Sequence, residues 1–288
     1  MKKAGIGIGN LLDFSLKYSG LACLALILLC LLSIIAIVAI RGLPALSLEM
    51  LTQSPKGGFY LGGGGGVLNA IIGSIYMSIG ATILAGIAGL PIAIVLQKEY
   101  SRGAKWAKFT RFCLDLLWGI PSIVFGAFGF ILMVQLGMGV SLGAGILTLA
   151  IVILPIMVRT MEEVLATIPR AVMEQSFSLG ATRLETFSML MARQALPGLV
   201  VGCLLGLGRA IGDAASVLFT AGYTDRIPAS IFEPAASLPL AVFFQLGSPI
   251  REVQDRAYAS ALILLIIVLV LTIAARWLGS RFEKSILR

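Results

Sequence analysis

The sequence predicts an all-α membrane protein with six transmembrane helices. Its 288 residues are 58% hydrophobic and only 12% charged, and the mean hydropathy is +1.00. A water-soluble globular domain is roughly 45–50% apolar and about 25% charged, so this composition excludes that class. Six apolar segments are each long enough to cross about 30 Å of hydrocarbon. The expected spans cover residues 19–40, 67–96, 112–137, 139–160, 196–222 and 257–279.

The apolar segments differ in length and in the residues that interrupt them. The first is too long for the core of a cleaved signal peptide, and no cleavage site of small residues follows it. The second contains Pro91 and several glycines, which predict a tilt or a kink. Between the third and the fourth, Gly137-Met138-Gly139 leaves room only for a tight turn. The fifth is expected to begin near the turn Leu196-Pro197-Gly198.

Lysine and arginine are distributed unevenly between the two sides of the predicted bundle. With a cytoplasmic N-terminus, sixteen of the 22 basic residues fall on cytoplasmic segments, five on the opposite side, and Arg209 within a span. Cytoplasmic loops carry such an excess, so both termini are expected to be cytoplasmic. The net charge of +8 then reflects topology and contact with anionic lipids, and it does not indicate nucleic-acid binding.

These spans divide the chain into three parts. Residues 1–66 comprise a cytoplasmic tail, the first span and an external loop that ends in the flexible run Gly62–Gly66. Residues 67–279 form the main membrane domain, and residues 280–288 form a cytoplasmic tail. A second external loop contains the apolar stretch Ser237–Gln245, which is too short to span and is predicted to be a short helix or a re-entrant hairpin.

A polar cytoplasmic loop, residues 161–195, has the sequence of two short helices separated by a glycine. Pro169 suits the first helical position, because its missing N–H would be unpaired there. Gly180 interrupts the pattern, and a second helix is expected from Ala181. Such a knob can present apolar side chains to a groove on a partner protein, whereas the alternative is an amphipathic hairpin on the membrane surface. The apolar side chains of the knob are Phe177, Leu179, Leu184 and Phe187.

Two ionisable residues, Arg209 and Asp213, lie inside the predicted fifth span. Each costs roughly 2.5–3.5 kcal/mol at the centre of a bilayer helix, so both are expected to face the protein interior or water. Their spacing of four residues places them on one helix face. Because a guanidinium matches tetrahedral oxyanions, the pair predicts part of an anion path. Asp213 would hold the arginine in position, limit its affinity, or pair with it when the path is empty. The alternative is that the two charges only neutralise each other for folding.

Three smaller patterns concern packing. Gly202 and Gly206 have the spacing of closely packed helices. Asp115 follows Arg111 by four residues, which favours a local ion pair as much as a gating role. The four cysteines are expected to be buried small hydrophobic residues, without a disulfide or metal role. They are Cys23, Cys30, Cys113 and Cys203.

The composition also argues against several activities. The chain has no histidine, which weakens any proposal of a histidine metal site, a catalytic triad or a histidine proton relay. The run Gly62–Gly66 is not followed by Gly-Lys-Ser/Thr, so the chain is not expected to bind ATP through a phosphate-binding loop. We therefore expect no enzyme activity, no cofactor and no metal in this chain.

Two segments resemble one known family. Glu174-Gln175-Ser176-Phe177-Ser178-Leu179-Gly180-Ala181 resembles the EAA loop of ATP-binding-cassette (ABC) importer permeases, and Leu207 to Ala221 resembles the PstA family of phosphate-importer permeases. Where that family usually has Glu and Pro, this chain has Asp213 and Ser216, and the loss of the proline predicts a straighter helix. Leu196-Pro197 comes one helical turn later than the family pattern places its Leu-Pro. The segments 111–126 and 154–163 are similar as well.

The resemblance implies a type I ABC importer (MetI-like) fold in a prokaryotic inner membrane, with the permease domain at 67–279. The chain would form half of a path for inorganic phosphate, with Arg209 and Asp213 lining it, and would perform no chemistry itself. The coupling contacts to the ATPase would come from Glu174, Phe177, Leu179, Gly180, Ala181, Thr182 and Arg183. The implied partners are a companion permease (PstC-like), an ATP-binding cassette ATPase dimer (PstB-like), an external phosphate-binding protein (PstS-like) and membrane lipids.

Two other transport functions remain open from the sequence. A permease for molybdate, sulfate or phosphonate would share the coupling loop, but it is not expected to share the Arg209–Asp213 segment so closely. An ion-driven secondary anion transporter would need no ATPase, and it would leave the cytoplasmic knob without a function.

Overall fold

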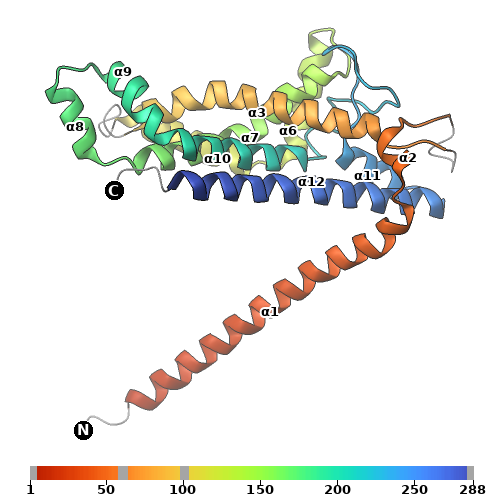
Figure 1. Cartoon of the computed structure of the whole chain (residues 1–288), viewed down its shortest axis with the longest axis horizontal. Coiled ribbons are helices and arrows are strands. Elements are labelled where there is room, and N and C mark those ends of the chain that lie inside the picture. Colours follow the sequence, from red (N-terminus) through yellow and green to blue (C-terminus); the bar gives the residue numbers. More distant parts are fainter. Residues whose placement is uncertain (1–4, 58–63, 98–103, 284–288) are drawn as a thin grey trace.

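The computed structural model describes residues 5–57, 64–97 and 104–283, and every regular element in these ranges is a helix. Four long helices lie side by side along the longest axis of the molecule: α3 (Leu68–Leu96), α7 (Leu142–Ala166), α10 (Ala192–Ile211) and α12 (Arg251–Glu283). A fifth, α1 (Gly5–Ala45), leaves this bundle at an angle (Figure 1). The short helices α8 (Arg170–Ser178) and α9 (Arg183–Glu185) lie at one end, and α2 (Leu48–Thr52) and α11 (Leu238–Leu246) lie at the other.

The third predicted span is bent, which corrects the expectation of one continuous helix over 112–137. Helices α5 (Lys105–Gly119) and α6 (Ser122–Gln135) meet at an angle of 99°. Proline lacks the N–H that would continue the helix, and it pushes the preceding residue toward extended backbone. Ile120, just before Pro121, is indeed extended, with φ −75° and ψ 128°. Within the described ranges, five other helices are long and apolar enough to span, so the total there is six if this pair counts as one.

The fifth predicted span, 196–222, is wrong at both ends. Helix α10 continues without a turn from the π-helix η2 (Thr186–Met191), so Pro197 lies inside the helix. Helix α10 then ends at Ile211, and residues 212–221 form turns and irregular backbone that are mostly buried or half-buried. These turns are held from outside: the Ser141 amide donates to the Thr220 carbonyl at 2.9 Å. The predicted straightening of this region after loss of the proline is therefore also wrong.

The core of the bundle is the contact between α3, α7 and α10. Ile153 and Met157 of α7 are fully buried in it. The predicted close packing at Gly202 and Gly206 is confirmed, because a Cβ on Gly206 would lie 2.8 Å from the Met157 side chain. A Cβ on Gly202 would similarly lie 3.2 Å from Thr160. The glycines let α10 approach α7 closely enough to hold its C-terminal end against the bundle.

A second, smaller core lies at the opposite end from α8 and α9. Here the predicted short helix is confirmed as α11 (Leu238–Leu246), which begins at the N-cap residue Ser237. The Leu238 amide donates to the Ser74 hydroxyl of α3 at 2.8 Å, which ties α11 to the bundle. Helix α2 (Leu48–Thr52) covers the same core through the buried Met50.

Helix α1 contributes almost nothing to either core. None of the side chains in its most apolar 18-residue window is buried within the chain. Cys23 and Cys30 lie on this helix and are exposed, and Cys113 and Cys203 are only half-buried, so the expectation of four buried cysteines is wrong. Contact with the bundle is made near Gly42, where an added Cβ would lie 2.7 Å from the Tyr258 carbonyl of α12.

Candidate functional site

The predicted pair of Arg209 and Asp213 is brought together at the end of α10. The Arg209 Nη1 lies 3.4 Å from the Asp213 Oδ1, which is long for a charged hydrogen bond. The arginine side chain is 47% exposed, whereas that of Asp213 is 6% exposed. Because α10 ends at Ile211, Asp213 stands on the following turn and not inside a helix as expected.

The buried carboxylate of Asp213 is only partly satisfied. Its Oδ1 accepts from Arg209, while its Oδ2 is buried without a hydrogen-bond partner among the described residues. The nearby Ser216 hydroxyl is in the same condition. Burial of an unsatisfied carboxylate oxygen is costly, so this segment keeps a polar group at the expense of stability. Buried groups of this kind are typical of functional sites.

The guanidinium of Arg209 borders a cavity of about 140 Å³ at the break between α5 and α6. Arg209 is the single charged residue among those that line this cavity. Ser122 lines it too and is the first residue of α6, so unpaired backbone N–H groups of the first helical turn lie nearby. The remaining lining is apolar and includes Trp118, Phe125 and Pro155.

Helix α6 reaches this position by packing directly on the turns that follow α10. A Cβ on Gly126 would lie 2.7 Å from the Ser216 carbonyl oxygen and 2.9 Å from that of Ala215, so only glycine fits. Sequence reasoning included Pro121 and Ser122 in the family-like segment 111–126 but missed the helix break that they form beside Arg209. The sequence Gly119-Ile120-Pro121 within an apolar run is the signal that could have found it.

A second group of charges joins α5 to α7. Glu162 accepts from Arg111 at 2.7 Å and from Arg159 at 3.4 Å. Arg159 also pairs with Asp115, which corrects the expected local pair of Asp115 with Arg111. The Gln97 side-chain amide, at the end of α3, donates to the Glu162 carbonyl at 3.0 Å, so the cluster ties three helices together.

The cytoplasmic knob has the predicted helix–glycine–helix form. Helix α8 (Arg170–Ser178) begins after Pro169, and Gly180 then takes φ +83°, a left-handed backbone that favours glycine. Helix α9 (Arg183–Glu185) follows at once and runs into η2. The knob stands at one end of the molecule, beyond the long helices (Figure 1).

Helix α9 is started by a reciprocal pair of hydrogen bonds. The Thr182 hydroxyl accepts from the Glu185 amide, and the Glu185 carboxylate accepts from the Thr182 amide at 2.8 Å. Hydrogen bonds to the charged form of a carboxyl lower its pKa. The pKa of Glu185 lies below its ordinary value mainly because of the bond from the Thr182 backbone N–H, and secondly because of the bond from the Thr182 hydroxyl.

The predicted coupling residues lie on the outer face of the knob. Leu179 is 88% exposed and Phe177 is 40% exposed. Phe187 is instead buried with Met173 and anchors the knob, which corrects the expectation that it faces a partner. The side chain of Leu184 lies outside the described part of the structure. Of the other predicted residues, Ala181 is half-buried, and Glu174, Gly180, Thr182 and Arg183 are exposed.

Comparison with known proteins gives one consistent family. The family described as "Binding-protein-dependent transport system inner membrane component" matches residues 87–288. The phosphate transport system permease protein PstA of Pasteurella multocida is 36% identical over 82% of this chain and 83% of its own length. A probable ABC transporter permease of Bacillus subtilis, YqgI, is 32% identical over 85% of this chain and 87% of its own.

Solved structures agree on the fold. A permease chain of the inward-facing methionine ABC transporter MetNI superposes with a TM-score of 0.58 at 20% identity, covering 77% of this chain and 96% of that one. A chain of an amino acid ABC transporter superposes with a TM-score of 0.53 at 17% identity, covering 76% and 92%. At these identities the likeness concerns the fold alone.

Proposed function

The chain belongs to the family of binding-protein-dependent transport system inner membrane components, and we propose that it is the permease subunit of an ATP-driven phosphate importer. Its relatives are ABC transporter permeases and not enzymes, so ATP hydrolysis takes place on a separate chain. A permease of this type works in a membrane with an ATPase and a substrate-binding protein. Phosphate as the cargo follows from relatives named as phosphate permeases that match more than four-fifths of the chain.

The observation that carries the proposal is the half-exposed guanidinium of Arg209 in a small cavity at a broken span. In transporters, the N-termini of broken helices face anionic substrates near the middle of the membrane. Helix α6 begins at Ser122 in this cavity, so an anion there would meet both a positive side chain and the positive end of a helix dipole. We infer that phosphate passes this point.

The partner of Arg209 suits transport more than tight binding. Asp213 holds the guanidinium through one long contact, so most of the five N–H donors of Arg209 stay available to an oxyanion. The carboxylate also weakens the attraction between the site and an anion, which favours release. Removal of Asp213 would be expected to strengthen binding and slow the exit of phosphate.

The knob at α8 and α9 is proposed to be the contact with the ATPase. Its exposed apolar residues, Leu179 and Phe177, fit the recognition mode in which a short helix lies in a groove. The buried Met173 and Phe187 join the knob to the core, so a displacement of α8 would be passed to α7 and α10. The closure of an ATPase dimer would thereby change access to the Arg209 cavity.

The finer assignments extend the same proposal. The second half of the path would come from a PstC-like companion permease, the ATPase would be PstB-like, and a PstS-like phosphate-binding protein would dock at the end that carries α2 and α11. The excess of lysine and arginine supports a cytoplasmic location for both termini and for the knob.

The test is uptake of radiolabelled phosphate into proteoliposomes that hold this chain with its companion permease, ATPase and binding protein. We expect uptake that requires internal ATP and that neither molybdate nor sulfate blocks. ATP-dependent movement of a competitor without phosphate uptake would replace the cargo and keep the importer. Ion-driven uptake without ATP would instead overturn the coupling to an ATPase.

A further inference from the structure

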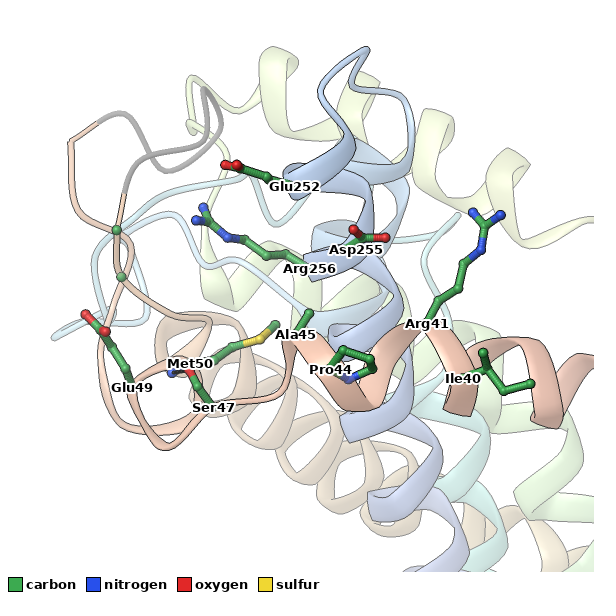
Figure 2. Close-up of a pocket in the computed structure, with 12 residues that line it drawn as sticks. Ile40, Arg41, Pro44, Ala45, Ser47, Glu49, Met50, Glu252, Asp255 and Arg256 are labelled. Atoms are coloured by element: carbon green, nitrogen blue, oxygen red, sulfur yellow. Dashed lines mark hydrogen bonds between the residues drawn. The ribbon is translucent and has the colours of Figure 1, made fainter.

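We propose that the cavity where α1 ends binds the headgroup of a phospholipid that carries one phosphate and one primary ammonium. The cavity has a volume of about 570 Å³ and lies between the end of α1, helix α2, the turn at Gly64-Gly65 and the start of α12 (Figure 2). It lies apart from the Arg209 cavity and from the knob, at the end of the molecule where the binding protein is proposed to dock. The inference therefore stands independently of the cargo.

The two helices that form the cavity place it at the level of lipid headgroups. In α1, 23 residues without a charge, 18–40, separate Lys17 from Arg41. In α12, 19 such residues, 257–275, separate Arg256 from Arg276. At 1.5 Å per residue these runs measure about 34 Å and about 28 Å, and both match a hydrocarbon core of about 30 Å. Two separate helices thus put Arg41 and Arg256 at the same membrane interface.

The charges that line the cavity are of both signs and are incompletely paired. Arg41 lies over the ring of Tyr258, 5.1 Å from its centroid, and its Nη1 donates to the Tyr258 hydroxyl at 3.5 Å. Its other N–H groups are available to a ligand. Within the described chain, the carboxylates of Glu252 and Asp255 have no ion-pair or hydrogen-bond partner. Glu49, in contrast, pairs with Lys56 at 3.6 Å. The cavity therefore offers a guanidinium to an anion and two carboxylates to a cation.

These groups select an amine-bearing zwitterion among the headgroups of that interface. A phosphate pairs with guanidinium through charge-assisted hydrogen bonds. A primary ammonium has three donors for the carboxylates, whereas a quaternary ammonium has none and prefers an open aromatic face. The ring of Tyr258 is already covered by Arg41. The phosphate of a purely anionic headgroup could still meet Arg41 or Arg256, but such a headgroup would bring no cation to Glu252 and Asp255.

The apolar edge of the cavity points to a lipid and not to a free zwitterion. Ile40 lines the cavity and is 72% exposed. Exposed apolar side chains continue from it along α1, including Ile37 and Ile34. Acyl chains attached to a bound headgroup would lie against this surface, and their burial adds to binding at about 0.8 kcal/mol per CH₂.

Backbone contacts join the segments that surround the cavity. A Cβ on Gly66 would lie 2.4 Å from the Met50 carbonyl, so α2 and the turn are in direct backbone contact. The Val67 amide donates to the same carbonyl at 2.9 Å. Gly42 brings α1 against Tyr258 in the same way. Segments that are already in contact lose less conformational entropy when a ligand fills the cavity.

The experiment is native mass spectrometry of the full-length chain, purified with its partner subunits, stripped of lipid and then given lipids of identical acyl chains. The probes are phosphatidylethanolamine, phosphatidylcholine, phosphatidylglycerol and soluble phosphoethanolamine. We expect one phosphatidylethanolamine to be retained at least fivefold more than the other lipids, and no retention of the soluble compound. Equal retention of the three lipids, or binding of phosphoethanolamine as strong as that of the lipid, would overturn the proposal.

Variants localise the retained lipid. The pair Arg41→Gln with Asp255→Asn should abolish the preference, and Glu252→Gln, a change at an exposed side chain that leaves the fold intact, should reduce it two- to threefold. Arg251→Gln removes an exposed charge that does not line the cavity and should change nothing. An unchanged preference in both lining variants would refute the site. Loss of binding-protein docking with an unchanged lipid preference would assign this surface to a protein partner and refute it as well.

Discussion

The charges around Glu162 and those around Arg209 differ in how fully they satisfy one another. Glu162 accepts from two arginines and its backbone carbonyl from Gln97, and Asp115 completes the cluster. Arg209 has one long contact and a half-exposed guanidinium, and the carboxylate of its partner keeps one buried oxygen unpaired. A saturated cluster fixes helices, whereas an open pair retains capacity for a ligand. The knob shows the same difference. Thr182 and Glu185 satisfy each other's hydrogen bonds at the start of α9, whereas the apolar side chain of Leu179 is exposed.

The largest expected effect is the loss of phosphate uptake when Arg209, of the Arg209–Asp213 pair, is replaced. Arg209→Gln should lower ATP-dependent phosphate uptake about 100-fold, since the charged contact to the anion is lost while the amide can still donate to Asp213. Thermal unfolding of the assembled complex should change little, because the Gln amide still donates to the buried Asp213 carboxylate. Arg209→Lys, which keeps the charge without the planar fork, should be intermediate. Normal uptake by the Gln variant would remove Arg209 from the path.

The uncovered part of the knob should give the next largest effect. Leu179→Asp should reduce uptake about tenfold, because a charge replaces an apolar contact buried against the ATPase. Its 88% exposure in the isolated chain means that the melting temperature of the purified chain should stay the same. Uptake and ATP turnover are measured in the same proteoliposomes, with Thr167→Asp on the same loop as control. Full coupling in the Leu179 variant would contradict the proposed contact.

A substitution in the cluster around Glu162 should lower the stability of the chain. Glu162→Gln leaves two arginines without their shared carboxylate and should cost about 1–3 kcal/mol. The thermal melting temperature of the detergent-solubilised chain should fall accordingly. Its exposed neighbour Glu163 provides the control Glu163→Gln, which should leave the melting temperature unchanged. If both variants melted alike, the cluster would not hold α5 to α7, and the contrast with Arg209 would disappear.

The smallest effect concerns the cap of α9. The lowered pKa of Glu185 means that the cap is complete above the ordinary carboxyl value of 4.5 and is lost as pH falls through the lower folded value. Between pH 5 and 8, α9 should therefore be unaffected. A ¹³C titration of the Glu185 carboxyl should show a midpoint below 4.5. In Thr182→Ala the midpoint should move only part of the way toward the ordinary range, because the hydroxyl is lost and the backbone N–H remains. An unshifted midpoint in the parent chain would contradict the cap.

The sequence predicts those parts of the molecule that depend on local rules. Helix α11, the glycine break at Gly180 and the close approach at Gly206 follow from capping residues, backbone conformation and spacing. The ends of the fifth span do not, because the apolar residues after Ile211 look the same whether they continue a helix or fill buried turns. The turn conformation is imposed by distant partners, such as the amides of Ser141 and Ala235.

The candidate site shows the same limit. The pairing of Arg209 with Asp213 could be predicted from a spacing of four residues, and it survives although the helix ends between them. The pairing of Asp115 with Arg159 spans two helices, so the local alternative, Arg111, was the wrong choice. The cavity beside Ser122 depends on a bend of 99° that hydropathy alone does not reveal.

The π-helical segment at Thr186–Met191 restricts how this chain can vary in length. A π-turn accommodates one residue more than the α-helix around it. Deletion of a single residue there would restore ordinary α-geometry and leave the outer face of α8 in nearly the same direction. The same deletion within α10 would instead turn everything on its N-terminal side by about 100°. Single-residue differences in length between the knob and α10 are therefore expected to occur at this segment in functional homologues and not within α10.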